Sequence, residues 1–142
     1  ALHDAEFVRY GVMHRNTYLN SPKLLDRYYR LRSDERISFA GQMTGVEGYV
    51  ESAASGMLAG IETAARVLGL ESVDFPQETA IGALAEYISG GSVGDFQPMN
   101  INFGIITPLG YRVKGKRNKN AEISRRSLEI IDKLLTKEVF RL

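Results

Sequence analysis

The sequence predicts an α/β fold, and three consecutive features predict it. A short, mostly apolar run at residues 36–40 is typical of a buried strand. A glycine-rich turn follows at residues 41–48, and a long helical pattern follows at residues 49–68. A strand, a turn and a helix in this order form the unit from which open α/β sheets are built.

The segments before this unit favour short strands and turns. Residues 7–18 are strand-prone, and residues 20–22 read as a turn. Residues 24–31 are ambiguous, but the pair Tyr28 and Tyr29 suits a short strand that ends at the polar turn 33–35.

Three helices are expected. The first spans residues 49–68 and stops at Gly69, and its glycines Gly56 and Gly60 predict a close packing partner. Its apolar positions are Val50, Ala54, Leu58, Ile61, Ala65 and Leu68. A second helix begins at residues 76–79 and runs to about Ser89, before a flexible loop at 90–94 and an ordered loop at 96–104. The last helix is expected from about Ala121 to Phe140, with a buried stripe of Leu128, Ile131, Leu135 and Val139.

Composition limits the possible function classes. A chain of 142 residues suits one domain, and its net charge of +1 favours no class of partner. No apolar run approaches the roughly 18 residues of a membrane span, so we expect no membrane partner. The sequence has no cysteine, which excludes a cysteine nucleophile here and is compatible with a cytoplasmic location. Two histidines without clustered carboxylates predict no metal site.

The glycine-rich turn is the first candidate site. The first turn of a helix leaves backbone N–H groups unpaired, and the helix dipole adds partial positive charge there. Glycines let a polar or anionic ligand approach those donors. The spacing differs from the dinucleotide-binding fingerprint, so from spacing alone a structural turn and a cofactor site are equally compatible.

Residues 37–56 resemble the second FAD-binding segment of the GidA-like flavoproteins. Two families share this pattern: the methylenetetrahydrofolate–tRNA-(uracil-5-)-methyltransferases (TrmFO) and the wobble-uridine modification proteins (MnmG). Residues 9–22, 45–52 and 96–104 look like the first family and not the second. The resemblance covers nearly the whole chain and thins after about Gly110.

The resemblance implies the C-terminal part of a doubly wound FAD-binding domain of the glutathione-reductase type. Residues 1–35 would end an inserted region and return to the FAD domain, and residues 36–142 would be the C-terminal half of that domain. Ala1 is not an initiator methionine, and the opening has no clear element start, so we interpret the chain as a fragment. Strand edges meant for the missing half predict self-association.

The resemblance also implies an activity. The family methylates the T-loop uridine of tRNA at the uracil 5-position, with methylenetetrahydrofolate as the carbon donor. Reduced FAD is the reductant, and NAD(P)H is its source. The family's catalytic cysteines lie upstream, so no catalytic residue is expected in this chain and the isolated fragment should be inactive.

By the same resemblance, the turn should contact FAD. The expected cofactor-binding residues are Gly41, Gln42, Thr44, Gly45, Val46, Glu47 and Gly48. The backbone N–H groups of Val46, Glu47 and Gly48 are expected to meet the pyrimidine edge of the flavin, and Gln42 and Thr44 to add side-chain hydrogen bonds. Glu47 either stabilises the positive helix end or recognises the folate pterin.

Substrate contacts are expected elsewhere. His14 and Arg15 are placed on the folate or tRNA side of the site, and Asn100 and Asn102 either line it or bond their own backbone. Between Arg112 and Arg126 stand seven basic residues and one acidic residue, which suit tRNA phosphates or simply a solvated face. Two alternatives therefore stay open: an MnmG-like protein, and a non-catalytic tRNA-binding module.

Overall fold

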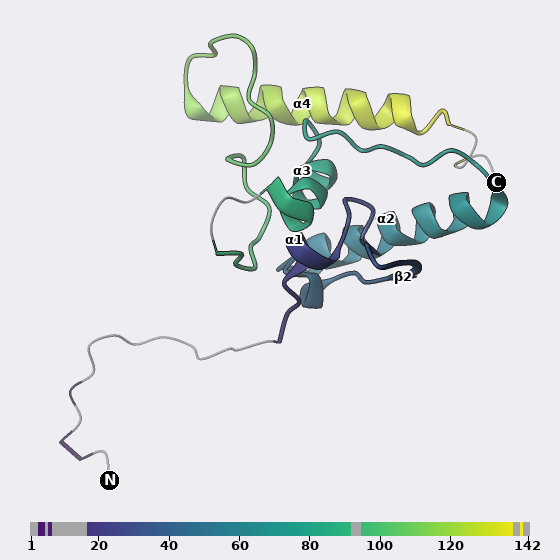
Figure 1. The fold of residues 1–142 in the computed structure, drawn as a ribbon. Coiled ribbons are helices and arrows are strands. Elements are labelled where there is room, and N and C mark those ends of the chain that lie inside the picture. The colour runs from purple at the N-terminus through teal and green to yellow at the C-terminus, as the bar shows by residue number, and fades with distance from the viewer. Residues whose placement is uncertain (1–2, 5, 7–16, 92–94, 138–139, 141–142) are drawn as a thin grey trace.

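The computed structural model describes residues 3–4, 6, 17–91, 95–137 and 140. Within them the chain has a mixed α/β structure in which helices predominate (Figure 1). The elements in chain order are α1 (Ser21–Leu24), β1 (Arg30–Leu31), β2 (Asp34–Ser38), η1 (Gln42–Thr44), α2 (Tyr49–Leu68), α3 (Ala80–Glu86), η2 (Tyr87–Gly91) and α4 (Lys116–Leu134). The predictions for residues 7–16, for residues 92–94 of the loop expected at 90–94 and for Val139 lie outside the described residues.

The two strands form a small antiparallel hairpin, in which Arg30 pairs with Ser38 and Leu31 with Asp34. The prediction of a buried strand at residues 36–40 is wrong, because β2 is half-buried at its start and exposed beyond it, and Ile37 is 44% exposed. The only strand that pairs with β2 in the described part of the chain is the two-residue β1, so β2 belongs to a small hairpin and not to a larger buried sheet. The domain boundary expected after residue 35 falls inside β2.

The segment before the hairpin differs in detail from its prediction. The turn expected at residues 20–22 leads into one helical turn, α1, at Ser21–Leu24. The strand that was predicted to include Tyr28 and Tyr29 begins after them, at Arg30 of β1. Tyr29 instead takes a left-handed conformation, with φ of 64°, and its side chain is buried in the core.

Helix α2 has the predicted bounds, because its signals are local. Gly69 ends it with φ of 68°, and the Gly69 N–H reaches back to the carbonyls of Ala65 and Arg66. Its predicted apolar face is only partly buried, since Leu58 and Ala65 lie in the core while Val50 is 80% exposed. The packing partner expected at Gly56 and Gly60 is also absent from the described residues, where no atom lies within 4 Å of a Cβ built at either glycine.

Helix α3 packs on the segment that leads into it. Its N-cap is Thr79, whose hydroxyl accepts a hydrogen bond from the Gly82 N–H at 3.1 Å and donates one to the Pro76 carbonyl at 2.8 Å. The helix begins four residues later than Pro76, where it was predicted to open. It continues into the π-helical turn η2, which is broken at Gly90 (φ 129°).

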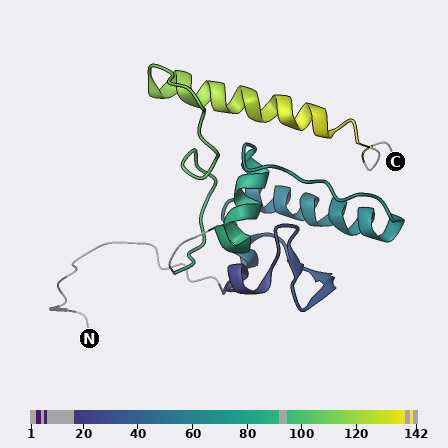
Figure 2. The same ribbon diagram turned by 45° about the horizontal axis from the view of Figure 1, so that its top comes forward.

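Helix α4 differs most from the prediction. It spans Lys116–Leu134 instead of residues 121–140, and Leu128, in the predicted buried stripe, is 64% exposed. Figure 2 shows α4 above the other helices, reached by the long connection after residue 95. Ile123 is its buried contact. Beneath it lies an apolar groove of about 500 Å³ that side chains of α2, α3 and α4 line together.

The main core lies between α1, α2, α3 and η2. Its buried members are Leu25, Tyr29, Val46, Leu58, Ala59, Val73, Phe75, Leu84, Ala85, Ile88 and Phe96. No helix among residues 17–91 and 95–137 is long and apolar enough to span a membrane.

Glu62 is a buried carboxylate at the edge of this core. Its Oε1 accepts a hydrogen bond of 2.6 Å from the Val73 N–H, while its Oε2 is buried without a partner in the described residues. The bond joins α2 to the extended segment that leads to α3.

Replacing Glu62 by alanine is expected to lower the free energy of unfolding by about 1–3 kcal/mol, because the buried Val73 N–H loses its acceptor. Urea unfolding measures this loss. Glu62→Gln is the matched variant, since it keeps an acceptor oxygen, and it should cost less. Equal losses in the two variants would contradict this role for the Oε1 bond.

Candidate functional site

The glycine-rich turn is held in a conformation that only glycine adopts readily. Gly41, Gly45 and Gly48 have φ values of 76°, 87° and 87°. The short helix η1 lies between the first two, and Gly48 is the N-cap of α2. All three glycines therefore use the backbone freedom that a side chain would restrict.

Three serine hydroxyl groups form hydrogen bonds with the backbone of the turn. Ser55 Oγ accepts a hydrogen bond of 2.8 Å from the Gly41 N–H, and Ser52 Oγ donates to the Val46 carbonyl at 3.3 Å. Ser21 Oγ, from α1, donates to the Thr44 carbonyl at 2.8 Å. These serines of α1 and α2 set the path of residues 41–46.

A distant loop pairs with the turn. Val46 and Met99 form an isolated parallel bridge, in which the Met99 N–H donates to the Gly45 carbonyl and the Glu47 N–H donates to the Met99 carbonyl, each at 3.0 Å. Phe96 packs over Gly45, because a Cβ built there would lie 2.4 Å from Phe96 Cζ. The 96–104 loop is ordered, as predicted, and it forms one wall of the site.

Burial divides the predicted cofactor-binding residues into two groups. Thr44, Gly45 and Val46 are buried, and the Thr44 hydroxyl donates to the Gly41 carbonyl at 2.7 Å. Gln42 is exposed, and Gly41, Glu47 and Gly48 are half-buried. In this structure the buried side chains of Thr44 and Val46 therefore stabilise the turn from the core. The Glu47 N–H is already bonded to the Met99 carbonyl of the 96–104 loop.

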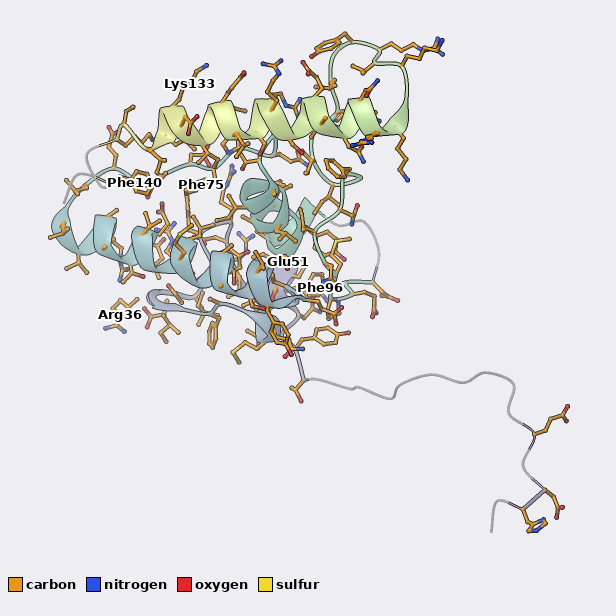
Figure 3. All side chains as sticks on the ribbon, turned by 180° about the vertical axis from the view of Figure 1, so that it is seen from behind. Arg36, Glu51, Phe75, Phe96, Lys133 and Phe140 are labelled. Atoms are coloured by element: carbon orange, nitrogen blue, oxygen red, sulfur yellow. The ribbon has the colours of Figure 1, made fainter. Side chains whose placement is uncertain are left out.

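The start of α2 is the open part of the site. Gly48 provides no side-chain cap, and Tyr49 and Val50 in the first turn are 98% and 80% exposed. Figure 3 labels Glu51, which lies on the same turn of α2. N–H groups at such a helix start attract electron-rich or anionic groups.

Two side chains border Gly48. A Cβ built at Gly48 would lie 2.3 Å from Glu51 Oε2 and 2.8 Å from Asn100 Nδ2. Glu51 Oε1 also accepts a 3.4 Å hydrogen bond from the Ile101 N–H. The acidic side chain in the first turn is therefore Glu51, while Glu47 precedes the helix. Asn100 therefore lies beside the start of α2.

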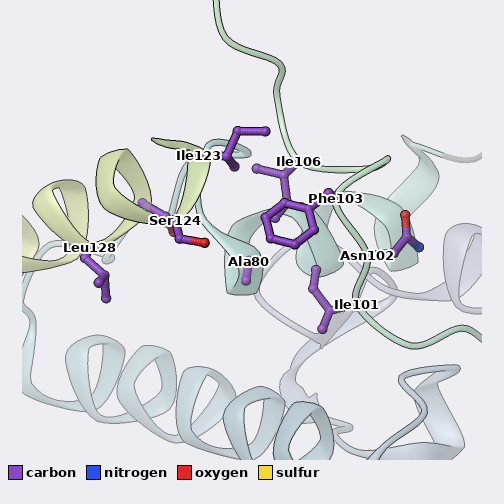
Figure 4. Close-up of a pocket in the computed structure, with 9 residues that line it drawn as sticks. Ala80, Ile101, Asn102, Phe103, Ile106, Ile123, Ser124 and Leu128 are labelled. Carbon is purple, nitrogen blue, oxygen red and sulfur yellow. The ribbon is translucent and has the colours of Figure 1, made fainter. Parts of the chain in front are cut away.

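Asn102 lies elsewhere. Its Oδ1 accepts a hydrogen bond of 2.8 Å from the Gly104 N–H, which is the local backbone bonding that the sequence left open as an alternative. Its side chain lines a cavity of about 370 Å³ together with Phe103, Ile106 and residues of α4 (Figure 4). The Asn102 amide nitrogen also donates to the Asn100 carbonyl at 3.4 Å, so the two residues are in contact, although only the Asn100 side chain borders Gly48. His14 and Arg15 lie outside the described residues.

Sequence reasoning did not single out Ser21, Glu51, Ser52, Ser55 or Phe96. Ser52 and Ser55 stand one turn apart at the start of a helix that follows glycines, and that spacing was the available signal. The roles of Ser21 and Phe96 depend on contacts between distant segments, which no local pattern reports.

Fold and site together define a mixed α/β protein in which a glycine-rich turn opens onto the start of a long helix. The chain belongs to the glucose inhibited division protein A family, which matches residues 1–71, half of its length.

Curated relatives resemble almost the whole chain. It is 58% identical over 136 residues to the methylenetetrahydrofolate–tRNA-(uracil-5-)-methyltransferase TrmFO of Anoxybacillus flavithermus, covering 96% of this chain and 32% of that protein. The proteins of the same name from Acetivibrio thermocellus and Bacillus subtilis are each 55% identical, over 96% and 92% of this chain and 31% and 30% of their own lengths. The chain therefore spans about a third of these relatives, and the predicted resemblance to their family is confirmed.

Proposed function

We propose that this chain is part of a folate- and FAD-dependent tRNA methyltransferase that methylates the T-loop uridine at the uracil 5-position. The observation that carries the proposal is the identity of 58% over 96% of the chain to a protein named for this reaction. The name of that relative favours this family over the MnmG-like alternative. Methylenetetrahydrofolate is the proposed carbon donor and NAD(P)H the proposed source of reducing equivalents.

The residues at the start of α2 fit the flavin. The exposed first turn and the uncapped Gly48 leave N–H donors accessible, and the Asn100 amide lies beside them. Gln42 is exposed and is a further proposed amide contact. Such donors stabilise negative charge on the pyrimidine edge of a reduced flavin. FAD, when bound, supplies the reducing equivalents. Gly41, Gly45 and Gly48 shape the backbone of this site, and Thr44 and Val46 hold it from inside.

Several assignments concern the complete protein. We propose that residues 36–142 contribute to a doubly wound FAD-binding domain, that residues 1–35 lead into it from an inserted region, and that the protein acts in the cytoplasm, where tRNA and folates occur. His14, Arg15 and the amide of Asn102 are proposed substrate contacts, and Glu47 is a proposed pterin contact or helix-end charge. Exposed apolar residues such as Ile37, Met57 and Val67 support self-association of the isolated chain.

The full-length protein should form 5-methyluridine in unmodified tRNA only when methylenetetrahydrofolate and NAD(P)H are both present. Nucleoside mass spectrometry measures the product, and absorbance measures bound flavin. Gly48→Ala should remove both activity and flavin, because its Cβ meets Glu51 and Asn100 at a φ of 87°. Lys133→Ala, on the exposed surface of α4, is the control and should keep both.

Product formed without folate would contradict the proposed reaction. A colourless, inactive full-length protein that still binds tRNA would favour the tRNA-binding module instead. The isolated chain is expected to give no turnover.

A further inference from the structure

The basic residues between Arg112 and Arg126 fall into two groups. Arg125 pairs with Glu122 and Glu129 on its own helix, and Arg126 donates to the carbonyls of Thr107 and Pro108. The hydrogen bond from Arg125 lowers the pKa of Glu122, so this carboxylate keeps its charge and its pairing. These two arginines stabilise α4 and attach it to the preceding loop.

The other five basic residues have no such role. All are exposed, and none forms an ion pair within residues 17–91 and 95–137. They stand in the last residues before α4 and in its first turn: Arg112, Lys114, Lys116, Arg117 and Lys119. We call this group the basic cluster.

Helix stability does not explain the basic cluster. The start of a helix carries partial positive charge, so each cation there costs about 0.3–1 kcal/mol where an acidic residue would stabilise by the same amount. The first turn of α4 contains no acidic residue, and its N-cap, Gly115, supplies no side-chain cap. Five uncompensated cations at this place raise the local positive potential, which is the electrostatic requirement of a surface that binds a polyanion.

An aromatic ring stands at the edge of the basic cluster. Tyr111 is 58% exposed, and its hydroxyl donates a 2.8 Å hydrogen bond to Glu122, which orients the side chain. Exposed aromatic rings beside cations are typical of surfaces on which unpaired nucleobases stack. Anionic membrane surfaces present no such bases, so this feature favours RNA.

The basic cluster is linked to the candidate site through the 96–104 loop. Asn102 and Phe103, two and three residues after Asn100, line one cavity with Ile123 and Ser124 of α4 (Figure 4). The 96–104 loop, which forms one wall of the candidate site, thus also lines a cavity with the helix that carries part of the basic cluster.

We propose that Arg112, Lys114, Lys116, Arg117 and Lys119 form a phosphate-contact surface for the tRNA, while Arg125 and Arg126 take no part in RNA binding. This proposal rests on the proposed function for the identity of the RNA. Phosphate contacts are independent of sequence and release counterions, so they are recognised by the dependence of affinity on salt.

The test uses the full-length protein and unmodified tRNA, with affinity measured by fluorescence anisotropy between 50 and 300 mM salt. In Lys116→Gln/Lys119→Gln, the slope of log K against log salt should fall in magnitude by about 1.5 to 2, and affinity at 0.1 M salt by roughly 10- to 100-fold. The matched control is Lys133→Gln/Lys137→Gln, which removes the same charge from the other end of the helix region and should leave the slope unchanged. Flavin absorbance should be equal in all three proteins.

An unchanged slope in Lys116→Gln/Lys119→Gln, or an equal decrease in the control, would overturn the proposal. So would unchanged tRNA binding together with loss of binding to phosphatidylserine vesicles, which would assign the basic cluster to a membrane surface. Failure of the proposed function is detected separately, as absence of methylation by the unsubstituted protein, because the binding comparison requires no turnover.

Discussion

Replacing Gly82 by alanine is expected to lower the free energy of unfolding by about 3 kcal/mol, at the upper end of ordinary overpacking costs. A Cβ at this position would lie 2.2 Å from the Pro76 carbonyl oxygen and 2.3 Å from that of Phe75. Both atoms belong to the backbone, and the Pro76 carbonyl is held by the N–H and hydroxyl of Thr79. The clash therefore cannot be relieved by rotating a side chain. Urea unfolding of the 142-residue chain measures the effect.

Gly60→Ala provides the matched control for this prediction. Gly60 also lies within a helix, but a Cβ there meets no atom within 4 Å. Alanine should stabilise the chain by about 0.5–1 kcal/mol, because it restricts the unfolded backbone more than glycine does. Equal effects at the two positions would contradict this prediction, because they would show that contact with the carbonyls of residues 75 and 76 adds no cost at Gly82.

Replacing Gly45 by valine is expected to cause the second large loss of stability. Its φ of 87° disfavours any side chain by about 1–2 kcal/mol, and the Cβ would meet the Phe96 ring at 2.4 Å, which adds about 1–3 kcal/mol. The ring would be displaced, and with it the segment around Met99 that is hydrogen-bonded to the turn. We therefore expect both lower stability of the chain and loss of flavin absorbance in the full-length protein.

A second substitution separates these two consequences. Phe96→Leu shortens the side chain that the new Cβ would meet, so Gly45→Val/Phe96→Leu should regain part of the stability that Gly45→Val loses. If flavin retention returns together with stability, Gly45 acts through Phe96. Stability regained without flavin would instead mean that Gly45 contacts the cofactor directly.

Helix α2 and the conformation of the turn could be predicted from the sequence because their signals are local. Alanine and leucine spacing, Gly48 before the helix and Gly69 after it fix the helix bounds. The exposure of β2 could not be predicted, because it depends on which distant segments cover the strand, and an apolar run does not identify them. The start of α4 was placed five residues late because a basic run after Gly115 lacks the capping residues that mark a helix.

The location of the candidate site could also be predicted from the sequence, but its accessible groups could not. The glycines located the turn, and the 96–104 segment was expected to line a site. Which groups of the turn face outward was not predictable, because the Val46–Met99 bridge joins residues far apart in the sequence. That bridge uses the Glu47 N–H and buries Val46, and it leaves the first turn of α2 as the accessible donor surface.

The bridge between Val46 and Met99 also bears on the order of events during synthesis. The ribosome makes the glycine-rich turn about fifty residues before it makes the 96–104 loop that pairs with it. Until Met99 has emerged, the Glu47 amide and the Gly45 carbonyl lack their partners, and Phe96 does not yet cover the turn. If the turn receives a flavin as proposed, cofactor loading is a late step that waits for translation to pass this point.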